Sequence, residues 1–204
     1  SLTDADYNVA MGVSALGTDT LGSRATALGF GTLANQNFTS GTNSYNTAVG
    51  FHAGVAVTTG LQNTLTGGHA GGALTDADFN VAMGYNALGF DTLGSKSVAI
   101  GYQTLKTQNL TSATDTYNTA VGFAAGQLVT TGLLNTFVGG LSGDAFTEGG
   151  ANTAVGYNSL SNDLKGFRSV AVGSGSLATQ QFSASTNAYN TAVGYNSGTA
   201  VTTG

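Results

Sequence analysis

A short pattern of polar, apolar and small residues recurs eleven times along the 204-residue chain. In most copies Asn is followed by Val or Thr, then Ala, then an aliphatic residue and Gly. β-Branched residues in a short run bounded by Asn and Gly are typical of a strand. The pattern therefore predicts one short strand ending at each of these glycines: Gly12, Gly29, Gly50, Gly67, Gly84, Gly101, Gly122, Gly139, Gly156, Gly173 and Gly194.

Successive glycines are separated by 17-residue or 21-residue steps, and the order of these steps repeats with a 72-residue period. A fixed period of this kind marks a solenoid, and a 17-residue step is too short for a pair of helices. We predict an all-β parallel solenoid with one rung per step, continuous over 1–204. Its four-rung units are 1–72, 73–144 and an incomplete 145–204, and we expect the chain to be part of a longer fibre protein. Each rung would hold two short strands and two turns, with the Asn side chains stacked on their copies.

The predicted strand is apolar or nearly so on both faces. Positions one and three before the glycine point to one side, and the Ala two before it points to the other. Strands that are apolar on both faces are normally covered on both. We expect the Ala column to meet another chain, and self-association about a common axis is the simplest cover.

Composition excludes several classes of partner. Only 7% of residues are charged and 41% are hydrophobic, which is unlike a disordered chain. A net charge of -5 disfavours nucleic acid and anionic membranes as partners. No apolar run approaches the roughly 18 residues of a membrane span, so we predict no direct membrane insertion. The absence of Cys excludes a disulfide framework and a thiolate zinc site.

The sequence offers no support for an enzyme. His52 and His69 are the only histidines, and they occupy one column of adjacent rungs. Strand stacking would bring them about 5 Å apart, near enough to share a metal. The next unit has Ala124 and Leu141 there, which favours solvated or ladder-packing histidines. No catalytic triad or phosphate loop recurs between units, so we predict no catalytic residue, no metal site and no cofactor.

Two aspartates recur in the first two units and are a plausible ligand pair for a hard cation. The third unit has Glu148 and Gly150 there, which favours turn-forming aspartates that bond their own backbone. The residues are Asp4 and Asp6, then Asp76 and Asp78.

An acidic and a basic residue, five positions apart, recur in all three units. The chain has five Lys and Arg residues, and three of them lie in this column. We predict an interchain or cross-turn ion pair that fixes register, against a solvated pair worth under about 1 kcal/mol. The pairs are Asp19 with Arg24, Asp91 with Lys96, and Asp163 with Arg168.

Four extra residues in each 21-residue rung form polar loops at 36–45, 108–117 and 180–189, which must protrude. Loops on a rigid scaffold often carry recognition, while a spacer or packing role is equally open. Asn37 and Asn109 also begin N-x-T sequons. The candidate contact residues are Gln36, Asn37, Phe38, Gln108, Asn109, Leu110, Gln180, Gln181 and Phe182.

Aromatic residues follow the glycine in seven copies, and we expect them to stack between rungs. Contact with carbohydrate is the alternative. The residues are Phe30, Phe51, Tyr85, Tyr102, Phe123, Tyr157 and Tyr195.

The segments NTAVGYNSL (152–160), NVAMGYNAL (80–88) and SVAIGYQTL (97–105) resemble the head repeat of trimeric autotransporter adhesins. That family, typified by the Yersinia adhesin head, repeats a motif close to SVAIG followed by xxS or xxA. The segments are also similar to head-type repeats of phage tail fibres. The resemblance implies a left-handed parallel β-roll, three chains about one axis, and an extracellular role at a cell surface or on a virion fibre. The 17-residue period and the 21-residue rungs depart from the family pattern.

We therefore expect a non-enzymatic extracellular fibre or adhesin segment, a rigid body that presents loops for attachment. Its partners would be itself, as a homotrimer or fibre, and a matrix protein, a glycan or a host-cell surface. The alternative is a structural filament or virion tail-fibre shaft that acts as a spacer without its own ligand.

Overall fold

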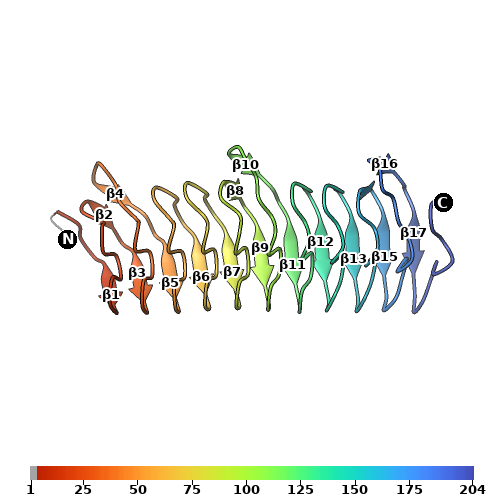
Figure 1. The fold of residues 1–204 in the computed structure, drawn as a ribbon, viewed down its shortest axis with the longest axis horizontal. Coiled ribbons are helices and arrows are strands. Elements are labelled where there is room, and N and C mark those ends of the chain that lie inside the picture. Colours follow the sequence, from red (N-terminus) through yellow and green to blue (C-terminus); the bar gives the residue numbers. More distant parts are fainter. Residues whose placement is uncertain (1–3) are drawn as a thin grey trace.

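Strands and turns make up residues 4–204, the part of the chain that the computed structural model describes, and no helix occurs there. The chain winds into a parallel β-solenoid, with rung after rung stacked along one long axis (Figure 1). One sheet of eleven strands runs the whole length, and its strand order follows the sequence. The predicted all-β solenoid with one rung per repeat is confirmed.

The eleven strands of the main sheet each contain three residues and end just before the repeat glycine. They are β1 (Val9–Met11), β3 (Thr26–Leu28), β5 (Thr47–Val49), β6 (Thr64–Thr66), β7 (Val81–Met83), β9 (Val98–Ile100), β11 (Thr119–Val121), β12 (Thr136–Val138), β13 (Thr153–Val155), β15 (Val170–Val172) and β17 (Thr191–Val193).

Three further two-stranded sheets accompany the 21-residue rungs. They pair β2 (Gly22–Ser23) with β4 (Thr42–Asn43), β8 (Gly94–Ser95) with β10 (Thr114–Asp115), and β14 (Gly166–Phe167) with β16 (Thr186–Asn187).

The register places every repeat directly on its copy, as in the pairing of Ala82 with Ala99 between β7 and β9. The repeat glycine permits this close stacking. Gly67 has a φ of +127°, and a Cβ there would lie 2.7 Å from the carbonyl oxygen of Gly84. A side chain at this position would therefore meet the backbone of the next rung in a conformation that L-residues rarely adopt.

The Ala column faces the inside of the solenoid. Ala27, Ala48, Ala82 and Ala99 are fully buried within a single chain. The expectation that this column meets another chain is therefore wrong, because its small size suits the narrow interior of the rung. The outward face of the sheet consists instead of the positions one and three before the glycine, such as Ile100, which are half-buried or exposed.

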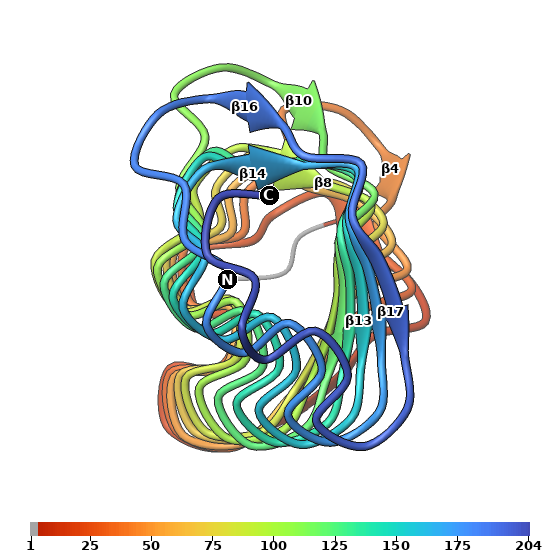
Figure 2. The same ribbon diagram turned by 90° about the vertical axis from the view of Figure 1, so that its right-hand side faces the viewer.

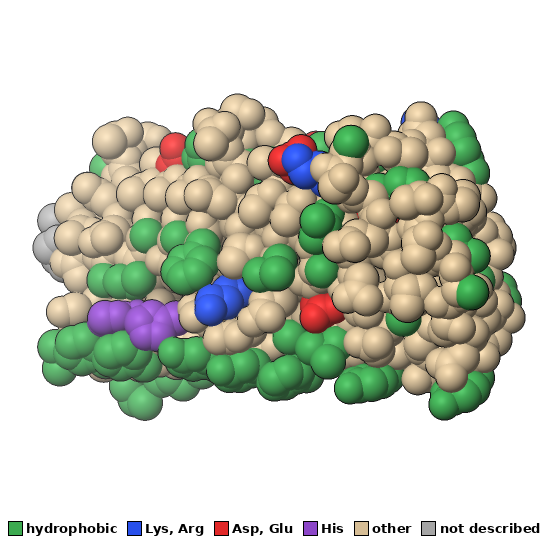
Figure 3. All heavy atoms as spheres, turned by 45° about the vertical axis from the view of Figure 1, so that its right-hand side comes forward, with side chains coloured by type: hydrophobic (Ala, Val, Ile, Leu, Met, Phe, Trp, Pro, Cys, Tyr) green, Lys and Arg blue, Asp and Glu red, His purple; other side chains and the backbone are tan. Residues whose placement is uncertain are grey.

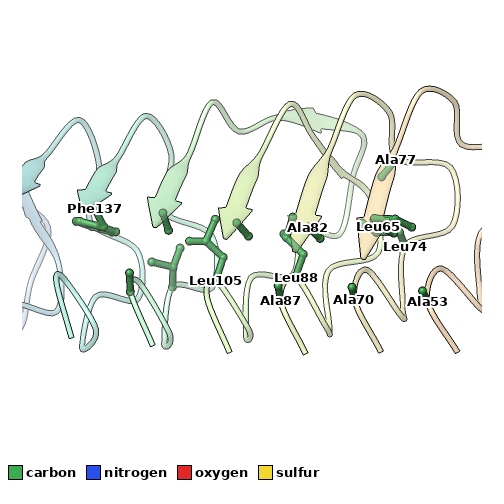
Figure 4. Close-up of a cluster of buried hydrophobic side chains, with 14 of the residues drawn as sticks. Ala53, Leu65, Ala70, Leu74, Ala77, Ala82, Ala87, Leu88, Leu105 and Phe137 are labelled. Carbon is green, nitrogen blue, oxygen red and sulfur yellow. The ribbon is translucent and has the colours of Figure 1, made fainter. Parts of the chain in front are cut away.

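Large side chains fill the interior in two alternating ways (Figure 4). In rungs such as that of Leu88, the fourth residue after the glycine is Leu and occupies the core. The other rungs have Gly at this position, and where two of them are adjacent, Leu65 or Phe137 replaces the strand Ala in the second. A Cβ on Gly54 would lie 2.6 Å from Leu65, and one on Gly126 would lie 2.9 Å from Phe137. The two exceptions in the Ala column thus fill space that glycine leaves open.

Asparagine side chains form a buried ladder beside the main sheet, as the sequence predicted. The Asn46 Oδ1 accepts the Asn63 backbone N–H at 2.9 Å, and the Asn63 Oδ1 accepts that of Asn80 at 3.0 Å. The Asn63 Nδ2 donates to the carbonyl of Ala77 at 2.7 Å. Each Asn therefore joins its own rung to the next one and satisfies backbone groups at the turn.

Candidate functional site

Three long loops, 36–45, 108–117 and 180–189, stand out from the body of the solenoid at β4, β10 and β16 (Figure 2). Their tips, at 39–41, 111–113 and 183–185, are exposed. The predicted protrusion is confirmed. Seen along the long axis, the loops lie above the same side of the body but are not in line with one another (Figure 2).

Most of the predicted contact residues anchor the loops and are not presented by them. Phe38, Leu110 and Phe182 are 5%, 6% and 8% exposed, and Gln36, Gln108 and Gln180 are fully buried. Asn37, Asn109 and Gln181 are exposed. The first six residues are therefore unsuited to bind a ligand directly, because their side chains lie against the core.

Each anchoring Gln belongs to a buried polar chain that begins at an Asp. In the second unit the Asp91 Oδ2 accepts from the Gln108 Nε2 at 2.5 Å, and the Asp91 Oδ1 accepts the Gly94 N–H at 3.0 Å and the Leu110 N–H at 3.2 Å. The Gln108 Oε1 accepts from the Asn118 Nδ2 at 2.8 Å. The chain of bonds therefore ties the base of the long loop to the Asn ladder.

The same Asp–Gln contact recurs in the other units. The Asp19 Oδ2 accepts from the Gln36 Nε2 at 2.6 Å, and the Asp163 Oδ2 from the Gln180 Nε2 at 2.6 Å. All three aspartates are fully buried.

The predicted ion pairs Asp19–Arg24, Asp91–Lys96 and Asp163–Arg168 are therefore wrong. The aspartate of each pair points into the core, whereas the basic residue has a positive φ, such as +62° at Arg24, and lies at the surface. Lys96 pairs instead with Asp115 of the long loop at 2.6 Å. Hydrogen bonds from the Lys96 ammonium to Asp115 and then Tyr117 raise the pKa of Lys96.

The basic residues lie in an exposed column with tyrosines. The Arg24 guanidinium lies 5.2 Å from the ring centre of Tyr7 and 5.7 Å from that of Tyr45. The Lys96 ammonium lies 5.3 Å from the Tyr117 ring. Arg24 also donates to the Asn43 Oδ1 at 3.1 Å. Each base thus joins a long loop to the preceding rung by at least one hydrogen bond and by a cation–π contact.

The third cluster contains Arg168 and Tyr189. The guanidinium lies 5.6 Å from the ring centre of Tyr189 and donates to the Tyr189 hydroxyl at 3.1 Å and to the Asn187 Oδ1 at 2.5 Å. We call these three groups, each a base with the tyrosine at the end of its long loop, the base–tyrosine clusters.

The aromatic ladder after the repeat glycines forms in part. The rings of Phe30 and Phe51 stack at 5.5 Å, those of Tyr85 and Tyr102 at 5.7 Å, and those of Tyr102 and Phe123 at 5.3 Å. With its aliphatic neighbours, this ladder produces an exposed apolar band along the molecule (Figure 3). We call this surface, together with the outward positions one and three before the glycine, the apolar face.

The two histidines lie beside this band (Figure 3). Their ring centres are 5.5 Å apart and the His52 ring stacks on Phe51 at 4.1 Å. Within residues 4–204, no group of three or more His, Cys, Asp or Glu side chains is placed to hold a metal ion. The contacts of the two rings are those of ladder packing.

The recurring aspartates of the second unit accept hydrogen bonds from the preceding rung. The Asp76 Oδ1 accepts from the Thr59 and Thr58 hydroxyls at 2.6 and 2.7 Å, and these bonds lower the pKa of Asp76. The Asp78 Oδ1 accepts the Leu61 N–H at 2.7 Å. These hydrogen bonds between rungs thus replace the hydrogen bonds that we expected the aspartates to form with the backbone of their own turn.

A groove of about 410 Å³ lies where the second unit meets the third. Leu133, Leu134, Ala151 and Phe167 give it apolar walls, and Glu148 and Arg168 stand among its lining residues. A second hollow of about 310 Å³ shares Phe167 and Arg168.

Sequence reasoning missed the Asp–Gln chains, although a signal was present. The seventh residue after the glycine reads Asp, Gln, Val and Leu through the first unit and Asp, Gln, Val and Phe through the second. The polar pair occurs where the fourth residue is Leu, and the apolar pair where it is Gly. This alternation indicates a shared position inside the core.

A comparison of the chain with known protein families, with curated proteins and with solved structures finds no match. Among residues 4–204 there is no helix of the length and apolar character needed to span a bilayer.

Proposed function

We propose that the chain is a segment of a non-enzymatic extracellular fibre, at a cell surface or on a virion, that assembles as a left-handed homotrimer. The observation that carries this proposal is the apolar face. Met83 is 40% exposed and Tyr85 is 49% exposed, and exposed apolar side chains recur toward both ends of the sheet, such as Met11 and Val193. An exposed apolar band that runs along a molecule is typical of an interaction site.

A second copy of the same chain is the partner that fits this face best. The face has a repeat of one rung, about 4.8 Å, and a partner with the same period can pack its side chains between those of the first chain. The outward side of the sheet carries an aliphatic residue before the glycine in ten of its eleven strands, beside a column of Val and Thr, and only the inner side is covered within one chain.

The interface is tested by placing charge on the apolar face. Ile100→Glu with Val121→Glu introduces two carboxylates whose burial between chains would be costly. We expect the variant to sediment as a single chain while its far-UV spectrum remains that of a β protein. Ser112→Glu with Ala113→Glu, at an exposed loop tip, is the matched control and should leave the trimer intact. A trimer that survives the first pair of changes would contradict the proposed interface.

Attachment would use the exposed loop tips and the base–tyrosine clusters, which present hydroxyl, amide and aromatic groups on a rigid wall. The candidate targets are a matrix protein, a glycan and a host-cell surface. Replacing 39–41, 111–113 and 183–185 by Gly-Glu-Gly keeps the loop length and the buried anchors. We expect adhesion to fall with little change in thermal stability.

A spacer without its own ligand is the second candidate, and a specific observation favours it. The second long loop is anchored by buried Gln108 and Leu110 and is held by the ion pair of Lys96. Such a loop can also serve only to stiffen the surface of the solenoid. Unchanged adhesion in the variant with replaced tips would support this spacer function and contradict attachment through the tips.

A further inference from the structure

The third unit lacks one aromatic ring and one carboxylate that the first two units carry at the same place. The first unit has Asp6 followed by Tyr7, and the second has Asp78 followed by Phe79. The corresponding residues of the third unit are Gly150 and Ala151. Both of these residues line the 410 Å³ groove.

The missing ring leaves one side of a guanidinium open. In the first unit Arg24 lies between two rings, Tyr7 at 5.2 Å and Tyr45 at 5.7 Å. In the third unit Arg168 keeps only the Tyr189 ring among its cation–π partners within residues 4–204, and the opposite neighbour in the column is Ala151. The groove therefore lies where the second ring of this sandwich would be.

The missing carboxylate leaves a backbone donor without an acceptor. Where the first unit meets the second, the Leu61 N–H donates to the Asp78 Oδ1 at 2.7 Å. Leu133 is the equivalent of Leu61, and within residues 4–204 the structure gives its N–H no acceptor. Leu133 also lines the groove.

The charge at the groove favours an anion. Arg168 bonds to the neutral Asn187 and Tyr189 side chains, whereas Glu148 is already paired with Lys165 at 2.9 Å. Phe167 replaces the serine of the first two units, and a Cβ on Gly150 would lie 3.1 Å from its ring. Phe167 therefore adds a further apolar surface beside the place where the carboxylate is missing.

We propose that this groove binds a small aryl carboxylate, whose ring completes the sandwich on Arg168 and whose carboxylate takes the place of the absent aspartate. The ring would lie over Ala151 against Leu134 and Phe167, and the carboxylate would accept from the Leu133 N–H beside the guanidinium. A volume of about 410 Å³ lies within the range of small-molecule sites. This site does not depend on the proposed fibre function.

The test uses 4-hydroxyphenylacetate as the probe, with binding followed by ligand-observed NMR and calorimetry on the intact protein. We expect saturable binding at one site per chain. Tyramine keeps the ring but replaces the anion by a cation, and cyclohexylacetate keeps the anion but lacks the aromatic ring. Each should bind at least tenfold more weakly, because each loses one of the two groups that the third unit lacks.

Two variants connect the binding to the groove. Ala151→Phe places a ring where the second unit has Phe79. The two positions share one backbone conformation, with a φ of +60° at Phe79 and +57° at Ala151, so the side chain can be accommodated. The added ring should abolish binding. Arg168→Gln should weaken binding at least tenfold. Ala113→Phe, the same change at an exposed loop tip, is the matched control and should bind like the parent. The absence of saturable binding by the parent, or unchanged binding in both groove variants with native far-UV spectra, would overturn the proposal.

Discussion

Replacing Asp91 by Asn changes a single oxygen to an amide nitrogen, yet it should disrupt the buried chain that holds the second long loop. The Asp91 Oδ1 accepts two backbone N–H groups, from Gly94 at 3.0 Å and Leu110 at 3.2 Å. An Asn here must keep its oxygen on these donors, so its Nδ2 would face the Gln108 Nε2, which lies 2.5 Å from the present oxygen.

Rotating the Gln108 side-chain amide removes this contact between two donors but creates another one at Asn118. Its nitrogen would then face the Asn118 Nδ2, which is 2.8 Å from the present oxygen. Asn118 cannot rotate in turn, because its Oδ1 accepts the Asn135 N–H at 2.9 Å and its Nδ2 donates to the Gly132 carbonyl at 2.7 Å. One buried contact between two donors therefore remains in every arrangement.

A buried polar group left without its partner costs about 1–3 kcal/mol. For a chain of this size that loss lowers the melting temperature by roughly 2–12 °C. Denaturant unfolding measures the free energy of unfolding, and amide exchange at Leu110 reports whether the loop opens locally. We expect faster exchange at this amide together with the global loss.

The compensating change is Gln108→Glu. In the double variant the amide introduced at position 91 donates to the carboxylate introduced at position 108, and the Asn118 Nδ2 still finds an oxygen. The Ser97 hydroxyl, now 2.9 Å from the Gln108 Nε2, can donate to the new carboxylate. The single Gln108→Glu variant should be destabilised, because it places two carboxylates in contact. The double variant should recover most of the loss, with a favourable coupling of about 1–3 kcal/mol. Wild-type stability in the Asp91→Asn protein, or simple addition of the two losses in the double variant, would refute the reasoning.

Further predictions concern the backbone and the exposed charges. Gly67→Ala should lower the free energy of unfolding by about 2 kcal/mol or more, whereas Gly41→Ala, where a Cβ meets nothing within 4 Å, should be nearly neutral in the same denaturant titration. The buried Asp144 Oδ1 has no hydrogen-bond partner within residues 4–204 and burial raises the pKa of Asp144, so its contribution to stability is lost as the pH rises through that pKa. Asp144→Ala should therefore melt higher than the parent at pH 7, and an equal or lower melting temperature would contradict this. Hydrogen bonds lower the pKa of Asp76, so its contribution should be lost as the pH falls through that pKa, and Asp76→Ala should flatten the acid limb of the melting-temperature profile. Lys96→Gln should leave the free energy of unfolding nearly unchanged, because its ion pair is exposed, and should leave the sedimenting mass unchanged.

The sequence predicted the strands and turns because the same residue types recur at the same positions of each repeat. A β-branched residue before Ala, and glycine after the strand, occur at the same step in nearly every rung, so the strand, the turn and the Asn ladder all followed from the period. The side of the sheet that faces inward did not follow. Alternation separates Ala82 from Val81 and Met83, but both sets are apolar, and only the narrow interior of the rung decides that Ala lies inside.

The candidate site was predicted less well, since side-chain direction at a turn depends on backbone conformation. Asp91 and Lys96 are five residues apart and were expected to pair, but the positive φ of +60° at Lys96 turns its side chain to the surface. Gln108 and Leu110 lie in a polar, protruding segment and yet are buried. The Gln108 side chain and the Leu110 N–H both donate to Asp91, which lies on the preceding rung. Spacing along the sequence does not predict such contacts between rungs.

The central claim, that the apolar face joins three chains, is tested most directly by the mass of the folded protein in solution. Sedimentation equilibrium over a range of micromolar concentrations should give three times the single-chain mass of 20.2 kDa, with a far-UV spectrum dominated by β structure. The Ile100→Glu, Val121→Glu protein should give the single-chain mass under the same conditions. A stable, folded parent protein of 20.2 kDa at every concentration would contradict the account.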